Sequence, residues 1–184
     1  VPGGKGANQA VAAARMGARV TMVGCIGNDS FGTTLVTNLE AEGINTSHVK
    51  IIPDAASGTA MITLDETGQN SIVVASGANM RLTPDHVRAA WDSLKDVDVV
   101  VMPLEVPLTC IQEAAKLAKG SRAQVVLNPA PAQPLPDELL TNIDVLVPNE
   151  TETALLSGKS VDTLQQAREA AQHFRAGGFR ARLR

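Results

Sequence analysis

Short runs rich in valine, isoleucine and leucine alternate along this chain with longer stretches in which apolar residues recur every three or four positions. The short runs are typical of buried strands, and the longer stretches are typical of amphipathic helices. A helix that connects two strands acts as a crossover, and crossovers favour parallel strands covered by helices. The pattern therefore predicts an α/β fold, with a doubly wound, mainly parallel sheet and flanking helices.

The individual elements follow from these runs and from the residues that begin and end them. Thr83-Pro84-Asp85 is a typical helix start, and Gly43 is a typical helix end. Strands of the parallel type are predicted at residues 20–26, 97–102, 124–127 and 144–147. Helices are predicted at residues 7–16, 31–42, 83–94, 107–119, 136–140, 151–156 and 163–176. The length of 184 residues suits one domain, so we expect residues 1–184 to form one partial α/β domain.

The middle of the chain departs from this alternation. Residues 59–64 and 71–74 are rich in β-branched side chains, and Asp65-Glu66-Thr67-Gly68 separates them. Two strands joined by so short a polar turn indicate an antiparallel hairpin. We therefore expect a hairpin lid at about residues 56–76, inserted in the main domain. Asp65 and Glu66 are interpreted as its tip rather than as an acid–base pair.

The end of the chain departs from it as well. A strand is expected after Gly177-Gly178, but every second residue of the segment 179–184 is arginine, which predicts that the sheet is interrupted there.

The overall charge and composition limit the classes of partner and location. The formal net charge of −3 and the isoelectric point near 5.6 argue against nucleic acid or a membrane as a partner. No apolar run reaches the ~18 residues of a membrane helix. Cys25 and Cys110 lack the spacing of metal ligands or of a disulfide framework, which favours reduced cysteines and a cytoplasmic protein.

Polar residues follow three of the predicted parallel strands directly. Glu105 follows the strand at 97–102, Asn128 follows 124–127, and Asn149, Glu150 and Glu152 follow 144–147. In open α/β sheets, ligands bind beyond the carboxyl ends of the strands. These residues are either a shared binding site or separate helix caps and turns.

A glycine-rich loop, Gly3-Gly4-Lys5-Gly6-Ala7-Asn8-Gln9, opens the first predicted helix. The free backbone N–H groups of a helix start can bind an anion or sugar hydroxyls, and glycine lets a ligand approach closely. The loop is neither a Walker A loop nor a dinucleotide fingerprint, so a ligand loop and a flexible helix start both remain open. His48, His86 and His173 have no evident catalytic partner and are predicted to be solvated.

Five segments together carry a family resemblance. They are Gly3 to Ala10, Ser76-Gly77-Ala78-Asn79, Leu104-Glu105, Asn128-Pro129-Ala130-Pro131-Ala132 and Pro148-Asn149-Glu150-Thr151-Glu152. In this order and spacing, the chain resembles the ribokinase-like (PfkB) carbohydrate kinases from Gly3 to about Gly178. The resemblance implies the doubly wound fold with its β-lid. It also implies phosphorylation of D-ribose at the 5-hydroxyl with ATP and Mg²⁺, in a homodimer formed through the lid.

The same resemblance assigns roles to residues of this chain. The substrate-binding residues that it implies are Gly4, Lys5, Gly6, Ala7, Asn8 and Glu105. Asn149 matches a nucleotide-binding residue, and Glu152 matches a carboxylate that organises magnesium through water. No catalytic residue is assigned, because the Gly-Ala-Gly-Asp segment that supplies the family's catalytic aspartate does not occur in this sequence.

The departures from the family pattern set further expectations. The family's N-terminal strand with its sugar-binding Asn and Asp has no counterpart in this sequence, and the K⁺ site of the family falls outside the match. We therefore expect an internal fragment that is inactive by itself. A deoxyribokinase or another pentose or nucleoside kinase remains an alternative, as does a non-catalytic sugar-binding or dimerising remnant.

Overall fold

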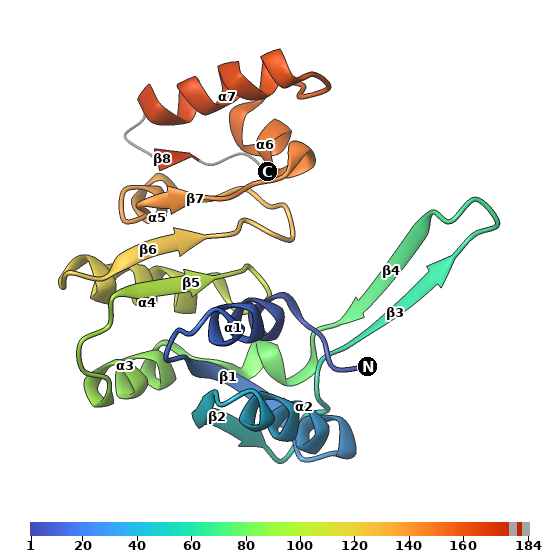
Figure 1. Ribbon diagram of the computed structural model, residues 1–184, viewed down its shortest axis with the longest axis vertical. Helices are drawn as coiled ribbons and strands as arrows, with labels where there is room; N and C mark the ends of the chain where they lie inside the picture. Colours follow the sequence, from blue (N-terminus) through green and yellow to red (C-terminus); the bar gives the residue numbers. More distant parts are fainter. Residues whose placement is uncertain (177–179, 182–184) are drawn as a thin grey trace. The chain divides into compact units, whose positions relative to one another are not determined.

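The computed structural model describes residues 1–176 and 180–181, and it divides the chain into two compact units, residues 1–82 and 83–184. Figure 1 shows the helices and strands of each unit. The predicted solvation of the His173 side chain lies outside the described residues, as do residues 177–179 and 182–184 of the basic tail. Within the described part, no helix combines the length and the apolar composition needed to cross a bilayer.

The first unit contains a small parallel sheet. Its elements are α1 (Lys5–Arg15), β1 (Thr21–Gly27), α2 (Ser30–Ala41) and β2 (Asn45–Ile52). Strands β1 and β2 are parallel, and α1 and α2 both contact β1. Ala10, Leu39 and Ile44 are buried together, and Ala7, Val11 and Ala14 of α1 pack against them because they repeat on one helical face. Strand β2 was not predicted, since its first four residues, 45–48, are all polar and give no apolar run.

An antiparallel arm extends from this unit. It consists of β3 (Thr59–Leu64), β4 (Asn70–Ala75) and the turn between them, and these residues 59–75 are called the arm below. Ile62 is paired with Ile72 in its register. At the tip, Asp65 Oδ1 accepts hydrogen bonds from the backbone N–H groups of Thr67 and Gln69 at 2.8 and 2.9 Å. The expected hairpin is therefore present, and a short 3₁₀ helix η1 (Gly77–Arg81) follows it.

The second unit contains a four-stranded parallel sheet in the order β5-β6-β7-β8. Its strands are β5 (Val99–Met102), β6 (Gln124–Leu127), β7 (Val145–Leu146) and β8 (Arg180–Ala181). Its helices are α3 (Pro84–Ser93), α4 (Leu108–Lys119), α5 (Asp137–Leu140), α6 (Glu150–Ser157) and α7 (Leu164–Ala176). Strands that are neighbours in this unit's sheet are also consecutive along the chain, with helices between them. This arrangement confirms the predicted α/β class with parallel strands and flanking helices.

The core of the second unit lies between its sheet and helix α4. Val125, Leu127 and Leu146 are fully buried on the strands. Ile111, Ala115 and Ala118 recur on one face of α4, and the same cluster contains all six residues. Burial of this continuous apolar face drives the unit together, because removal of apolar surface from water is the main favourable term in folding.

The predicted interruption of the sheet after residue 178 was wrong. Arg180 and Ala181 form β8, which pairs in parallel with Val145 and Leu146 of β7. Strand pairing uses backbone N–H and C=O groups, so it does not require the apolar side chains that we had used as the criterion. Charged residues are common on strands at the edge of a sheet, where they discourage pairing with other chains.

Candidate functional site

The three predicted strand-end clusters of the second unit lie at one edge of its sheet. Met102 is paired with Leu127, and Leu127 is paired with Leu146, so β5, β6 and β7 end at the same level. Glu105, Asn128 and Asn149 follow these three residues within one to three positions. Because the strands are parallel and level, the segments that follow them emerge at one edge. The structure thus brings together the residues that the sequence analysis had grouped.

Hydrogen bonds connect the segments at this edge. The Asn128 backbone N–H donates to Met102 O at 2.9 Å, and its Nδ2 donates to Val147 O at 2.9 Å. The Leu104 N–H donates to Ala130 O at 2.8 Å, which ties the segment before Glu105 to the Asn-Pro-Ala-Pro run. Glu105 is half-buried next to this link. Asn128 therefore holds the β5 and β7 ends together, and the edge is a connected frame rather than three separate loops.

Asn149 and Glu152 form a capping box at the start of α6. Asn149 Oδ1 accepts a hydrogen bond from the Glu152 N–H at 2.8 Å, and Glu152 Oε2 accepts one from the Asn149 N–H at 2.9 Å. Thr153 Oγ1 donates to Asn149 O at 2.6 Å. Glu152 is only 5% exposed, although it is a carboxylate. A buried carboxylate needs such partners, and here it also interacts favourably with the positive end of the helix dipole.

The glycine-rich loop of the first unit forms the start of α1. Gly4 has φ +94°, a conformation that favours glycine, and its carbonyl oxygen accepts the Asn8 N–H at 2.9 Å. No side chain caps this helix, and the geometry of a helix start leaves the backbone N–H groups of Gly6 and Ala7 without a partner inside the helix. A Cβ added to Gly3 would meet no atom within 4 Å. Lys5 and Asn8 are exposed. The loop can therefore present backbone donors to a ligand.

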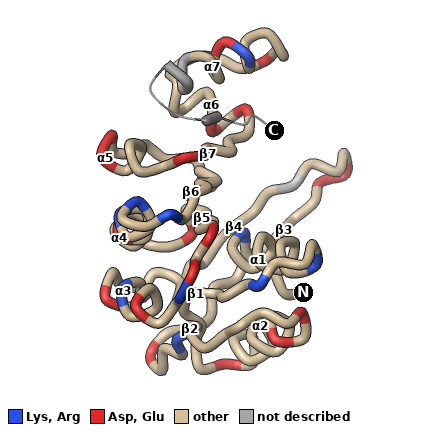
Figure 2. Tube along the Cα trace, turned by 60° about the vertical axis from the view of Figure 1, so that its left-hand side comes forward, with Lys and Arg blue, Asp and Glu red and all other residues tan. Residues whose placement is uncertain are grey.

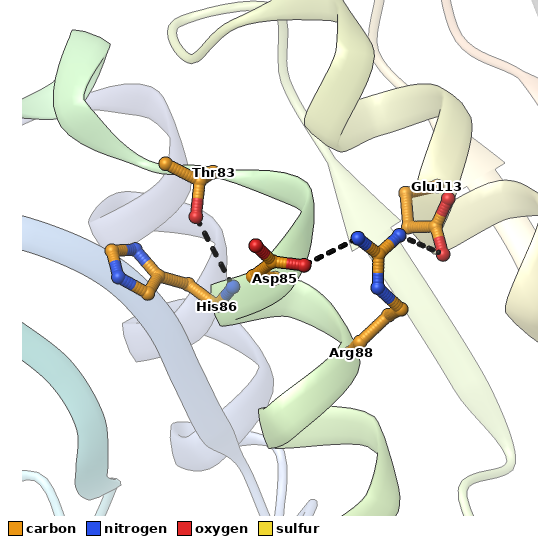
Figure 3. A network of polar contacts seen from close by, with 5 residues as sticks. All are labelled: Thr83, Asp85, His86, Arg88 and Glu113. Carbon is orange, nitrogen blue, oxygen red and sulfur yellow. Dashed lines mark hydrogen bonds and ion pairs between the residues drawn. The ribbon is translucent and has the colours of Figure 1, made fainter.

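His86 lies at the start of α3, next to a network of hydrogen bonds and ion pairs that joins α3 to α4 (Figure 3). Thr83 Oγ1 accepts the His86 N–H and caps α3, while Arg88 pairs with Asp85 and with Glu113 of α4, the latter at 2.8 Å. Glu113 and Asp85 raise the pKa of Arg88 through these hydrogen bonds. His86 was predicted to be solvated, but it is half-buried and its Nδ1 atom is buried without a hydrogen-bond partner. The side chain faces away from Arg88 and plays no part in this ion-pair network.

Sequence reasoning missed Ser57. In the described part of the chain, the buried polar or charged residues are Ser57, Glu152 and Thr153. The Ser57 backbone N–H and hydroxyl both donate hydrogen bonds to the carboxylate of Asp29, which caps the start of α2. The two residues are 28 positions apart, so no local pattern connects them. Within the described ranges 1–176 and 180–181, no three His, Cys, Asp or Glu side chains are grouped to hold a metal ion.

Comparison with known proteins gives consistent results. The family model of the pfkB family carbohydrate kinases matches residues 1–181 of this chain. The ribokinase of Haemophilus influenzae is 47% identical over 177 residues, which cover 96% of this chain and 58% of that protein. The deoxyribokinase of Salmonella typhi is 42% identical over 171 residues, which cover 92% of this chain and 56% of that protein.

A solved structure agrees with this match. The structure of Arabidopsis thaliana ribokinase complexed with ribose and ATP superposes with a TM-score of 0.85 at 30% identity, over 98% of this chain and 60% of that chain. The chain thus spans slightly more than half the length of these relatives. The family match over residues 1–181, the 47% identity to a ribokinase and the shared fold show that the chain belongs to the pfkB family of carbohydrate kinases.

Proposed function

We propose that this protein is a sugar kinase that transfers the γ-phosphoryl group of ATP to the 5-hydroxyl of D-ribose. The observation that carries the proposal is the common edge formed by Glu105, Asn128 and Asn149 beyond three level strands. Positioning and electrostatics provide most of the catalysis in phosphoryl transfer, so a rigid edge of this kind suits the reaction. The names of the relatives support ribose and ATP as the substrates. We further propose that residues 1–184 belong to one kinase domain.

We propose that the Gly4–Asn8 loop and Glu105 each contribute to sugar binding, as the family resemblance implies. The backbone N–H groups of Gly6 and Ala7, at the start of α1, have no partner inside the helix, and the Asn8 side chain is exposed. Glu105 offers carboxylate oxygens, which accept hydrogen bonds from sugar hydroxyls. Donors and acceptors together can orient a polyol for transfer without taking up its proton.

We propose that Asn149 contacts the nucleotide and that Glu152 organises magnesium through water. The buried Glu152 carboxylate binds the Asn149 N–H through Oε2, which fixes its position at the start of α6. Mg²⁺ prefers oxygen ligands and usually keeps several waters, so one fixed carboxylate beside substrate phosphates fits its chemistry. Potassium activation and a cytoplasmic location remain predictions for the whole protein. Cys25 and Cys110 are buried and not joined in a disulfide, which is compatible with the predicted location.

We propose that the arm forms a homodimer contact. Its strands carry no charged residue, and Figure 2 shows acidic residues only near the tip. Large apolar side chains on both faces of the arm are exposed: Met61, Ile62, Leu64, Ile72, Val73 and Val74. An exposed apolar surface of this kind marks an interaction site. Sedimentation of the wild type and of Ile62→Lys at several concentrations tests the contact, with a dimer expected for the wild type and a monomer for the variant.

The proposed activity is tested with protein expressed from the complete reading frame. We expect ATP-dependent phosphorylation of ribose, measured by ADP release. Glu105→Gln should lower kcat/KM about 10- to 100-fold, mainly through KM, because it weakens hydrogen bonds to a charged acceptor. Glu138→Gln, an exposed carboxylate on α5, is the matched control and should change neither constant. Absence of any pentose phosphorylation would refute the proposal, whereas ribose turnover by residues 1–184 alone would overturn the expected inactivity of this chain.

Deoxyribokinase activity is the second candidate, favoured by the 42% identity to the Salmonella typhi enzyme. The substrates of the two candidate activities, ribose and 2-deoxyribose, differ by one hydroxyl. A site built to hydrogen-bond this hydroxyl discriminates strongly against the sugar that lacks it. The ratio of kcat/KM for ribose and 2-deoxyribose therefore separates them. A ratio well above one supports the ribokinase proposal, and a ratio below one supports the alternative.

A further inference from the structure

Both ends of the arm attach to the first unit at one place. This place, called the arm base below, comprises residues 27–32, 55–58 and 76–79. The first segment is the end of β1 and the start of α2, the second leads into β3, and the third follows β4. The three segments are far apart in sequence but are joined by hydrogen bonds. The arm base is therefore the place where the direction of the arm is determined.

Asp29 is the centre of the hydrogen bonding in the arm base. Its Oδ2 accepts the Ser57 N–H at 2.7 Å, and its Oδ1 accepts both the Ser57 hydroxyl at 2.7 Å and the Gly32 N–H at 2.7 Å. The Ser57 Oγ in turn accepts the Gly27 N–H at 2.9 Å. The hydrogen bond from the Ser57 N–H, followed by those from the Gly32 N–H and the Ser57 hydroxyl, lowers the pKa of Asp29 below its usual value. One carboxylate thus caps α2 and also binds the chain that enters the arm.

Glycines allow this close approach. A Cβ on Gly27 would lie 2.4 Å from Ala55 O and from Ser57 N, and a Cβ on Gly32 would lie 2.4 Å from Gly27 O. Real Cβ atoms essentially never lie this close to backbone atoms, so larger residues at these two positions would push the segments apart. Ser57, which lies between them, is only 3% exposed. The arm base is therefore closely packed although its interactions are polar.

The segment that leaves the arm is fixed at the same place. The Ala78 N–H donates to Ala56 O at 2.8 Å, and Ala78 is fully buried. Gly77 has φ +50°, and a Cβ there would lie 2.3 Å from Ala56 O. The chain leaving the arm is thus bonded directly to the residue that precedes Ser57. Asp29 consequently controls both ends of the arm through one short segment.

The arm itself has no comparable support. Every described side chain of β3 and β4 is exposed. A two-stranded hairpin that packs against no other layer is only marginally stable, and no packing contact fixes its direction. The bonds at the arm base must therefore hold the arm at a fixed angle to the unit from which it extends.

We propose that Asp29 is a positioning residue that fixes the orientation of the arm through Ser57. Its consequence for catalysis rests on the proposed sugar kinase function and on the family resemblance, which implies that the β-lid covers the bound sugar. A loosened arm would then raise the KM for ribose more than it lowers kcat, because covering the sugar contributes to binding.

The variant Asp29→Asn separates capping from positioning. Asn has one acceptor oxygen, so it can cap α2 through Gly32 but places an N–H donor opposite the Ser57 N–H. Asp29→Ser also retains a side chain favoured at helix starts while removing both carboxylate oxygens. Asp65→Asn is the matched control, since it makes the same chemical change in the arm but at the tip, where Asp65 bonds only within the turn.

The orientation is measured by spin-label distances in the protein from the complete reading frame. Labels at Glu66→Cys on the tip and Thr37→Cys on α2 report it, because Cys25 and Cys110 are buried and should not react. Excess unlabelled protein removes distances between two copies. We expect a narrow distribution in the parent and in Asp65→Asn, and a broad one in Asp29→Asn and Asp29→Ser. Hydrogen exchange of the Ser57 amide should be about tenfold faster in both Asp29 variants, while α2 amides stay protected.

Kinetics supply a second readout. For Asp29→Asn we expect about a tenfold rise in the KM for ribose and a kcat within about twofold of the parent. An unchanged distance distribution and Ser57 exchange in both Asp29 variants would overturn the positioning role. A broadened distribution in a protein without kinase activity would instead uphold that role and contradict the proposed function, so the two failures are distinguishable.

Discussion

Each of the two units of this chain is stabilised internally by a different kind of interaction. Among the described residues, the largest fully buried side chains all belong to the second unit: Leu127, Leu139, Leu146, Val125, Thr153, Pro129, Pro148 and Cys110. The first unit has a smaller cluster around Ala10, Leu39 and Ile44. Its arm base relies on the Asp29 carboxylate and the buried Ser57.

This difference shows how each kind of interaction serves the proposed kinase. Burial of apolar surface is non-directional, so it supplies stability to the sheet that carries Glu105 and Asn149. Hydrogen bonds depend steeply on angle and distance, so they can fix the direction of an arm that has no apolar support. The first unit therefore uses polar contacts where orientation matters, and the second uses apolar contacts where rigidity matters.

The largest effect is expected from the core of the second unit. Leu127→Ala removes a side chain with 0% exposure and should lower the free energy of unfolding by about 2–5 kcal/mol through lost burial and a cavity. Leu164→Ala, at 70% exposure on α7, is the same change at the surface and should have little effect. Urea denaturation followed by circular dichroism gives both values. Equal losses for the two variants would show that the apolar core does not hold this unit.

The sequence predicted the fold well wherever local patterns determine it. Strands 59–64 and 124–127 have the predicted bounds, because continuous apolar or β-branched runs between turns mark them clearly. Strand β2 was missed, since its first half, Asn45-Thr46-Ser47-His48, consists of polar residues although every second one is partly buried. Strand β8 was missed because its pairing depends on the backbone and on β7 rather than on its own side chains.

The candidate site was predictable for the same reason, but only in part. The rule for parallel strands placed Glu105, Asn128 and Asn149 at one edge, and the level register bears out this grouping. Their roles toward sugar and nucleotide stay predictions. The bond between Asp29 and Ser57 could not be predicted, because it joins residues 28 positions apart and depends on how β1, α2 and the arm meet.

A smaller effect is expected at the arm base. Gly32→Ala adds a Cβ that would lie 2.4 Å from Gly27 O and 2.8 Å from Ser57 Oγ. Overpacking of this kind costs about 1–3 kcal/mol, which exceeds the roughly 1 kcal/mol that alanine gains over glycine inside a helix. The measured free energy of unfolding should therefore fall. Gly120→Ala is the control, since its Cβ would meet Leu117 O at 3.4 Å and its backbone is helical. A stabilised Gly32→Ala would mean that the arm base is loosely packed.

The smallest effect is expected from a polar contact within the apolar unit. Asn149→Ala removes the cap of α6 and should lower the free energy of unfolding by about 0.5–2 kcal/mol, because the Glu152 N–H loses the side-chain oxygen that accepts its hydrogen bond. Asn149→Ser keeps a capping oxygen, so it should restore most of the stability in the same urea measurement. If Asn149 also contacts the nucleotide, both variants should raise the KM for ATP, because neither has the amide group. A KM for ATP that recovers in Asn149→Ser together with stability would reduce the role of Asn149 to capping, and the edge of the second unit would then be polar for structural reasons alone.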